Sequence, residues 1–245
     1  PLLFLAGLVD AIGGGGGLIS LPAYLLAGVP VHNAIATNKL SSACGTTLTT
    51  LRFIRQGLVN WKIAVPTIVF AMLGSSLGAN LSMKTDEGVM ENILFIVLPL
   101  VAFVVMNPKL FRDHEGTEVV LNGRLWATAI LSSFLVGIYD GFYGPGTGTF
   151  LLLSFCYLGK IDVRTASGNV KLVNLASNIG ALFTSLAAGK VLIPLGLISA
   201  VFATAGQYIG AGLALKNGSK IVRPVILVVI VLLAIKVLLE FFGIA

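Results

Sequence analysis

Long apolar stretches separated by short polar joints occupy almost the whole sequence and constrain its fold more than any other feature. They cover residues 2–12, 17–29, 34–55, 62–83, 88–106, 123–142, 148–158, 164–187, 191–215 and 221–243. A helix that crosses a bilayer needs about 20 apolar residues, and several stretches are that long. Only 11% of the 245 residues are charged, against about 25% in soluble domains. We therefore expect an all-α, polytopic protein of the lipid bilayer with about ten membrane segments.

The net charge of +6 does not indicate a nucleic-acid partner, because no basic stretch with interleaved aromatic residues is long enough to follow a phosphate backbone. The two cysteines, Cys44 and Cys156, lie far apart and form no CxxC motif. The zinc-binding pattern HExxH is absent. We expect neither a metal site nor a cofactor.

One hydrophilic stretch, residues 107–122, divides the chain almost in half. Residues 1–106 and 123–245 are expected to form two membrane halves joined by this linker. The short apolar runs at 17–29 and 148–158 are compatible with half-helices, with re-entrant segments, or with helices whose polar ends lie outside the run.

Short matches in the same order indicate that the two halves are repeats. The matched segments, 130 to 132 residues apart, are GLVD at 7–10 with GIYD at 137–140, the glycine run 13–17 with 143–148, NKL at 38–40 with NVKL at 169–172, and GxxxGA at 74–79 with GxxxGA at 206–211. A nearly constant offset is hard to obtain by chance, so the sequence predicts an internal duplication.

The placement of Lys and Arg favours an inverted duplication. With five segments per half, two basic residues (Lys84 and Lys190) fall on one side of the membrane and eleven on the other. The eleven are Arg52, Arg55, Lys62, Lys109, Arg112, Arg124, Lys160, Arg164, Lys216, Lys220 and Arg223. Since basic loops mark the cytoplasmic side, we expect an inner-membrane protein with a cytoplasmic linker and both termini outside. Inverted repeats with broken segments are typical of secondary transporters.

Glycine-rich breaks occur at corresponding places, GGGGG at 13–17 and YGPGTG at 143–148. Broken backbone within a bilayer is tolerated only where it is buried in protein or lines a cavity. The N–H groups that start the following half-helix suit an anion. Tight helix packing without a ligand is the alternative. The residues expected to contact substrate are Gly16, Gly17, Gly146, Thr147 and Gly148.

Two lysines, Lys39 and Lys171, lie inside apolar runs beside Asn38 and Asn169. A lysine near the bilayer centre costs about 2.5–3.5 kcal/mol, so one placed there usually has a function. The alternative is a side chain that extends to the interface. Brought together by an inverted repeat, the lysines would bind a small anionic substrate, and the asparagines would add directional hydrogen bonds.

Asp10 and Asp140 directly precede the two breaks. Each is expected to pair with a lysine, to carry a coupling proton, or to cap the broken backbone. The residues themselves do not distinguish these roles.

Residues 74–78 read GSSLG and match the GxSxG pattern of serine hydrolases. Their counterpart at 206–210, GQYIG, has no serine, so the shared element is GxxxG, a helix-packing motif. We therefore expect no enzymatic activity. Exposed GxxxG faces would permit a homodimer.

The two glycine-rich breaks, ATNKL at 36–40 with SGNVKL at 167–172, and the GxxxGA elements resemble the TauE/SafE family of sulfite exporters over nearly the whole chain. The resemblance implies export of sulfite or a small organosulfonate, coupled to an ion gradient. Five consecutive glycines and Pro145 depart from the usual pattern of such proteins. The residues agree with a midplane anion site and alternating access between the halves. An anion channel and a non-transporting membrane subunit remain open.

Overall fold

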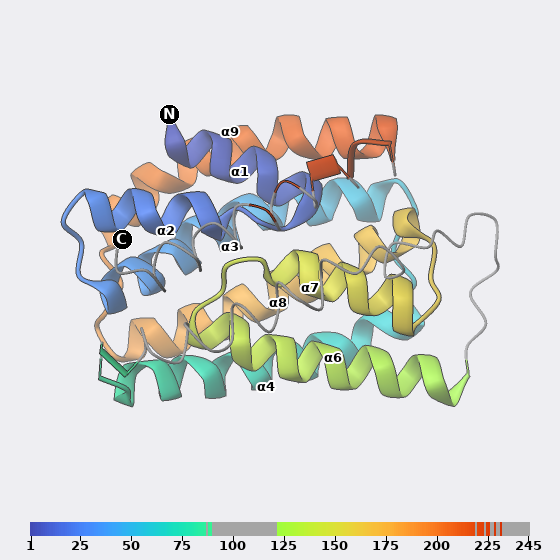
Figure 1. The fold of residues 1–245 in the computed structure, drawn as a ribbon, viewed down its shortest axis with the longest axis horizontal. Helices are drawn as coiled ribbons and strands as arrows, with labels where there is room; N and C mark the ends of the chain where they lie inside the picture. Colours follow the sequence, from blue (N-terminus) through green and yellow to red (C-terminus); the bar gives the residue numbers. More distant parts are fainter. Residues whose placement is uncertain are drawn as a thin grey trace.

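The computed structural model describes residues 1–86, 88–89, 122–218, 220–222, 224, 225, 228 and 231. The first part of the chain supplies α1 (Leu2–Gly13), α2 (Gly17–Leu26), α3 (Val31–Arg55) and α4 (Trp61–Lys84). The second supplies α6 (Gly123–Phe142), α7 (Thr147–Leu153), the π-helix η2 (Ser154–Leu158), α8 (Val163–Ala187) and α9 (Ile193–Asn217) (Figure 1). The all-helical expectation is confirmed for this part of the chain. The expected segments 88–106 and 221–243 and the linker 107–122 fall almost entirely outside the described residues.

Polar caps set where several helices begin. Asn60 accepts a hydrogen bond from the main-chain N–H of Lys62 at 3.1 Å, at the start of α4. Asn122 caps α6 in the same way, and Asp162 accepts from two N–H groups at the start of α8. These side chains satisfy donors that have no partner within the helix. The caps therefore fix the boundaries that the apolar runs only approximate.

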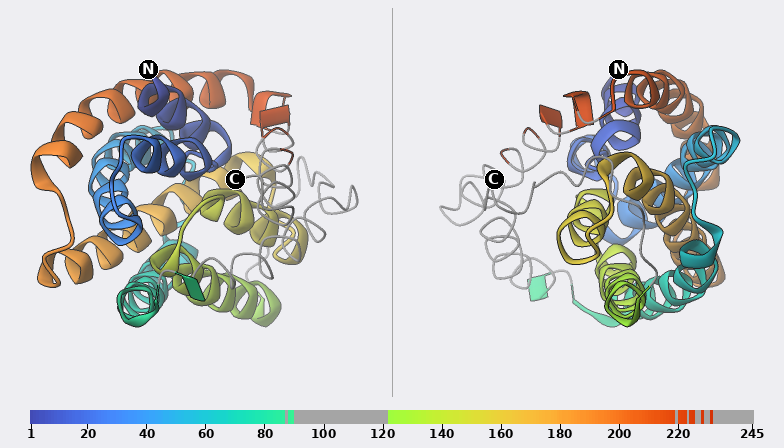
Figure 2. Two further views of the ribbon diagram at one scale, coloured as in Figure 1. Left: turned by 60° about the vertical axis from the view of Figure 1, so that its left-hand side comes forward. Right: turned by 90° about the vertical axis from the view of Figure 1, so that its right-hand side faces the viewer.

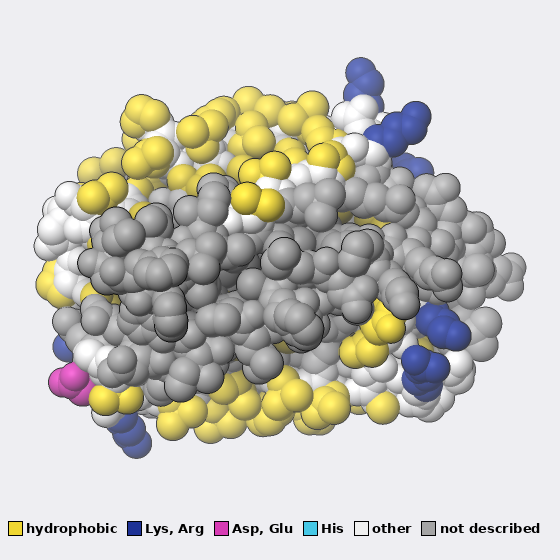
Figure 3. All heavy atoms as spheres, in the orientation of Figure 1, with side chains coloured by type: hydrophobic (Ala, Val, Ile, Leu, Met, Phe, Trp, Pro, Cys, Tyr) yellow, Lys and Arg dark blue, Asp and Glu magenta, His cyan; other side chains and the backbone are white. Residues whose placement is uncertain are grey.

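Four helices of the described residues, α4, α6, α8 and α9, are long and apolar enough to cross a membrane. Their outward faces carry large apolar side chains, such as Val65, Leu73, Leu77, Leu197 and Val201. Figure 3 shows these hydrophobic side chains along two opposite margins of the molecule. The 25-residue α3 is as long as α8 but more polar.

The helices pack as two bundles, and each bundle contains helices from both parts of the chain. Consecutive helices α3 and α4 do not pack extensively together; α4 packs against α6 and α8 instead. In the same way, α9 leaves α8 and packs against α1 and α3. We name α1, α2, α3 and α9 bundle A, and α4, α6, α7, η2 and α8 bundle B. Figures 1 and 2 show α9 beside α1 on one side of the molecule and α4 beside α6 on the other.

The GxxxG elements lie inside the protein rather than on its surface, which corrects the expectation that their faces are exposed for a homodimer. Gly74 and Gly78 of α4 approach the backbone of α6, where a Cβ on Gly74 would lie 3.1 Å from the nitrogen of Ile138. Gly206 and Gly210 of α9 approach α1 in the same way. Small residues let helix backbones come this close. The glycines therefore stabilise the α4–α6 and α1–α9 contacts, and the homodimer stays a prediction that does not rest on them.

Basic side chains gather at one end of the molecule. That end contains the last turn of α3, the starts of α4, α6 and α8, and the last turn of α9 (Figure 1). Its described basic residues are Arg52, Arg55, Lys62, Arg124, Lys160, Arg164, Lys216 and Lys220, whereas Lys84 and Lys190 lie at the opposite end. Figure 3 shows the same asymmetry. The unequal division of basic residues that the sequence predicts is therefore also present between the two ends of the molecule.

The shift in offset between matching segments has a local cause. α7 and η2 together span Thr147–Leu158, 12 residues, whereas the corresponding α2 has 10 residues. A π-turn accommodates extra residues within a helix. The offset is consequently 130 before this point and 132 after it, where α3 and α8, both of 25 residues, begin at Val31 and Val163.

Candidate functional site

The two glycine-rich breaks touch each other through their backbones. The first break follows α1, with Gly14 at φ 77°, and the second contains Gly144 and Gly146 at φ 103° and 82°. A Cβ on Gly148 would lie 2.6 Å from the Cα of Gly14. A side chain at either position would separate the breaks. Glycine is therefore required here for the close approach as well as for the turn.

Lys39 of α3 forms a buried ion pair across the bundles. Its Nζ lies 2.8 Å from Oδ1 of Asp140 in α6, and both side chains are at most 4% exposed. Thr147 donates to the same carboxylate oxygen at 2.8 Å, and Ser177 donates to Oδ2 at 2.6 Å. Each charge thus has a direct protein partner. We call Lys39, Asp140, Thr147 and Ser177 the Lys39 station.

Lys171 of α8 is buried to the same degree but binds differently. Its Nζ donates to the main-chain oxygen of Asp10 at 2.6 Å. The Asp10 carboxylate accepts from the N–H of Gly16 at 3.4 Å and from Nε2 of Gln207 at 3.2 Å. We call Lys171, Asp10, Gly16 and Gln207 the Lys171 station. The lysine here is bound to a peptide dipole rather than directly to a carboxylate.

The two stations lie at different depths. Each lysine is the ninth residue of a 25-residue helix, and α3 and α8 run in opposite directions (Figure 1). With a rise of 1.5 Å per residue, the Cα atoms lie about 6 Å on either side of the midpoint of the helices. The Gly14–Gly148 contact joins the two broken segments whose residues contact the lysines.

The two asparagines do not occupy equivalent positions. At the offset of 132 that relates α3 to α8, Asn169 corresponds to Thr37 and not to Asn38. Oδ1 of Asn169 accepts the main-chain N–H of Asn60 at 3.2 Å, and its Nδ2 donates to the carbonyl of Thr165 at 2.9 Å. Thr37 accepts the N–H of Leu192 in the matching way, at 3.0 Å. Both side chains therefore fasten a loop in this structure, while Asn38 is buried in α3.

The other residues expected at the breaks are partly engaged by the protein. The N–H of Gly16 and the hydroxyl of Thr147 bind the two aspartates. A Cβ on Gly17 would lie 3.0 Å from the Cα of Pro145, and Gly146 caps α7 in the left-handed conformation. The breaks thus serve packing and turn formation, and their residues surround the two aspartates.

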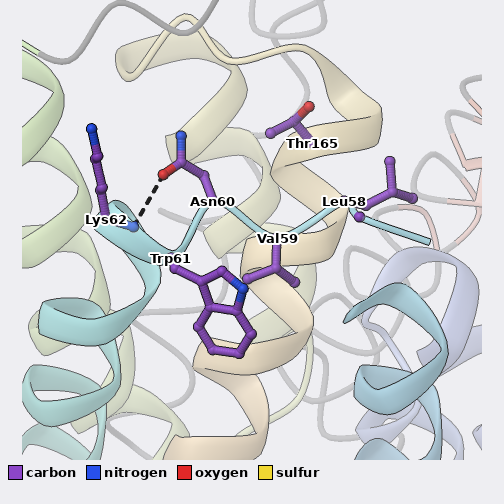
Figure 4. A pocket seen from close by; sticks show the side chains of 7 residues that line it. Leu58, Val59, Asn60, Trp61, Lys62 and Thr165 are labelled. Atoms are coloured by element: carbon purple, nitrogen blue, oxygen red, sulfur yellow. Dashed lines mark hydrogen bonds between the residues drawn. The ribbon is translucent and has the colours of Figure 1, made fainter. Parts of the chain in front are cut away.

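An open depression of about 500 Å³ lies at the basic end. Gly57, Leu58, Val59, Asn60, Trp61, Lys62 and Thr165 line it. Figure 4 shows Asn60 between the start of α4, which contains Lys62, and the start of α8, which contains Thr165. The side chain of Asn60 points toward the main chain of Lys62. Because the N–H of Asn60 binds Asn169, the loop that lines the depression is fastened to α8 two residues before Lys171.

Sequence reasoning missed two residues of the site: Ser177 binds Asp140, and Gln207 binds Asp10. Thr149, in the second break, donates to the carbonyl of Gly13 at 2.6 Å. Gln207 could have been found as a large polar residue between two packing glycines in an apolar helix. Ser177 gives no such signal, because serines are common in membrane helices.

Chemically, the site holds two buried cations opposite two aspartates and has no excess of positive charge. The Lys39 ammonium is neutralised by Asp140. An incoming anion would compete with this carboxylate for the same cation. The arrangement thus suits exchange of partners at a lysine better than permanent retention of an anion.

Comparisons with known proteins agree with a membrane transporter. The family model "Sulfite exporter TauE/SafE" matches residues 1–237. The chain is similar to probable membrane transporter protein ORF9 of Sinorhizobium sp, 34% identical over 238 residues, which are 97% of this chain and 90% of that protein. It is also similar to probable membrane transporter protein YfcA of Escherichia coli K12, 35% identical over 240 residues, or 98% and 88% of the two chains. No solved structure matches it.

Proposed function

This chain belongs to the TauE/SafE family of sulfite exporters, and from that membership we propose that it is a secondary transporter of a small sulfur-containing anion. Sulfite or an organosulfonate is the expected substrate, exported across the inner membrane by alternating access. The observation that carries the proposal is the pair of buried lysines at the same register of α3 and α8, both located where the bundles meet.

Lys39 and Lys171 would supply charge to the anion, and the breaks at Gly16–Gly17 and Gly146–Gly148 would supply N–H donors. Asp140 competes with the substrate for Lys39, because both are anions that bind one ammonium. A proton on Asp140 would free Lys39, and its loss would return the ion pair. Asp10, whose carboxylate accepts from Gly16 and Gln207, would carry a second coupling proton beside Lys171. Movement of substrate would then be coupled to a proton gradient.

Membrane orientation follows from the charge at the two ends. Basic residues gather on the cytoplasmic side of membrane proteins, so the end with Arg55, Lys62 and Arg164 would be cytoplasmic. The linker 107–122 would lie on that side. The opposite directions of α3 and α8 and their equal lengths support inverted repeats of five segments each.

Uptake into proteoliposomes tests the proposal. Sulfite, sulfate, a two-carbon sulfonate and a carboxylate of equal size are each offered with and without a pH gradient. We expect saturable movement of a sulfur oxyanion that is lost in Lys39→Ala and in Lys171→Ala. Lys190→Ala, which changes an exposed side chain at the opposite end, is the matched control and should transport normally.

Two results would contradict the proposal. Transport by a folded Lys39→Ala or Lys171→Ala protein at the unaltered rate would remove that lysine from the site. Flux that neither saturates nor shows counterflow would identify an anion channel, since only a carrier accelerates exchange.

A further inference from the structure

We propose that the units that move during transport are bundle A and bundle B, rather than residues 1–106 and 123–245. Bundle A joins α9 of the second part of the chain to three helices of the first part, and bundle B joins α4 of the first part to helices of the second part. The bundles turn relative to each other about Gly57 and Gly189. The inference rests on the proposed transport function and concerns how access to its site alternates.

Helix packing separates the two bundles. Extensive contacts join α4 to α6 and α8 within bundle B, and α9 to α1 and α3 within bundle A. Between the bundles, the substantial helix contacts are α3 with α8 and the smaller contact of α1 with α7. A body whose parts are tightly packed moves as a unit, whereas an interface made mainly by one helix pair, here α3 with α8, can slide.

Glycines strengthen the contacts within each bundle. Gly137 of α6 faces α4, where its Cβ would lie 2.9 Å from the carbonyl oxygen of Ala71. Gly210 faces α1, with its Cβ 2.9 Å from that of Ala11. Such contacts recur along the α4–α6 and α1–α9 helix pairs, whereas the close glycine contacts between the bundles, such as Gly14 with Gly148, are confined to the two breaks. The α4–α6 and α1–α9 contacts join segments from different parts of the chain, so movement between residues 1–106 and 123–245 would have to break them.

Four polar contacts that join helices or breaks of different bundles involve the candidate site. They are the Lys39–Asp140 ion pair, the Lys171 bond to Asp10, a bond of 3.1 Å from Thr50 to the carbonyl of Lys171, and the bond from Thr149 to the carbonyl of Gly13. An anion that displaces these partners would therefore loosen the interface at the place where it binds.

The crossing loops have a glycine at the point where each leaves its first bundle. Gly57 follows α3 with φ 69°, and Gly189 follows α8 with φ 67°. No other group lies within 4 Å of a Cβ built at either position. Beyond them, Asn60 is bound to α8 and Leu192 to α3. Each loop is thus fastened to its second bundle before the next helix begins, which leaves the glycine as the bend.

Chemical cross-links (staples) between introduced cysteines test whether the moving units are bundles A and B or residues 1–106 and 123–245. Phe70 of α4 and Phe134 of α6 have ring centroids 6.4 Å apart within bundle B. Arg52 of α3 contacts Tyr208 of α9 within bundle A. Each pair is changed to two cysteines in a Cys44→Ser protein and joined by a bifunctional thiol reagent. The matched controls are the four proteins that carry one introduced cysteine each beside the buried Cys156, treated with the same reagent.

Both staples connect residues 1–106 to residues 123–245 but remain within one bundle. We expect each stapled protein to transport at the rate of its controls. Loss of flux in both on stapling, with recovery when the staple is cleaved, would overturn the proposal. A wild-type protein that moves no anion would instead contradict the proposed function, so the two failures are distinguishable.

Spin-label distances give an independent readout. Leu26 and Leu81 are exposed residues of the first part of the chain that lie in different bundles. Leu77 and Leu135 are exposed residues of different parts that lie in bundle B. On addition of the transported anion, the distance between labels at Leu26→Cys and Leu81→Cys should shift, and that between Leu77→Cys and Leu135→Cys should not. The reverse pattern, or no shift in either pair of a protein that transports, would overturn the proposal.

Discussion

The Lys39 and Lys171 stations place the same side chain at the same register of two helices, yet they compensate its charge differently. Lys39 pairs with the Asp140 carboxylate at 2.8 Å. Lys171 binds the main-chain oxygen of Asp10 at 2.6 Å, and the Asp10 carboxylate binds Gly16 and Gln207 instead. A carboxylate that faces a lysine must be displaced by an anion, whereas a carbonyl dipole competes less strongly. The comparison teaches that matching lysines need not have equal roles.

The largest expected effect on this comparison comes from removing the aspartate charges. Asp140→Asn leaves Lys39 buried without a counter-charge and should lower the free energy of unfolding by about 3–5 kcal/mol. Asp10→Asn keeps the main-chain acceptor of Lys171 and should cost about 1 kcal/mol. Thermal unfolding of the purified proteins in detergent measures both. Equal losses would mean that the two stations depend on their carboxylates alike.

Removing both partners of the ion pair sharpens the same point. Replacing a buried pair with apolar residues of similar size is often neutral for stability. Lys39→Met combined with Asp140→Leu should therefore recover most of the stability that either single change loses, while transport remains absent. The double variant is compared with its two single variants by the same unfolding assay. A double variant that is as unstable as the singles would show that the pair is needed to specify the fold.

The contact between the breaks gives the next largest effect. Gly14→Ala must place a Cβ against the backbone of Gly148 in a left-handed conformation, which we expect to cost about 2–3 kcal/mol. Gly57→Ala is the matched control, since it has a similar φ but no neighbour within 4 Å, and should cost about 1 kcal/mol. Both values come from thermal unfolding. Similar losses for the two variants would show that the breaks do not need close contact.

The smallest expected effect concerns one hydroxyl. Ser177→Ala removes the 2.6 Å hydrogen bond to Asp140 and should cost about 1 kcal/mol. Ser133 is also buried, but its hydroxyl has no hydrogen-bond partner in the described part of the chain. Ser133→Ala should therefore be neutral or slightly stabilising. If the two serines behave alike in unfolding, the Ser177 bond does not stabilise the Lys39 station.

Much of the fold could be predicted because apolar length and polar caps are local properties. The described helices follow the apolar runs closely; the run at 62–83, for example, became Trp61–Lys84. The correspondence between Asn38 and Asn169 was harder to predict. The short helices before them differ in length by two residues, which changes the alignment of α3 with α8. The sequence alone therefore paired Asn169 with Asn38, whereas helix bounds pair it with Thr37.

The GxxxG motifs show a different limit. Their sequence predicts close helix packing but does not identify the partner helix. The expectation of an exposed face was wrong, because Gly74 and Gly206 face helices of the same chain. The partner of a small-residue face depends on how the loops cross, and loop direction leaves no periodic signal in the sequence.

By itself, the sequence determined that the chain is helical, that it suits a bilayer, that its charge is uneven and that it carries two embedded lysines, since these follow from composition and local spacing. Tertiary structure alone decided that α4 and α9 exchange bundles, that Lys39 binds a carboxylate while Lys171 binds a carbonyl, and that Ser177 and Gln207 bind the aspartates. Those contacts join residues 37 to 197 positions apart. Only the packed fold brings such residues together, because sequence spacing does not specify which faces meet.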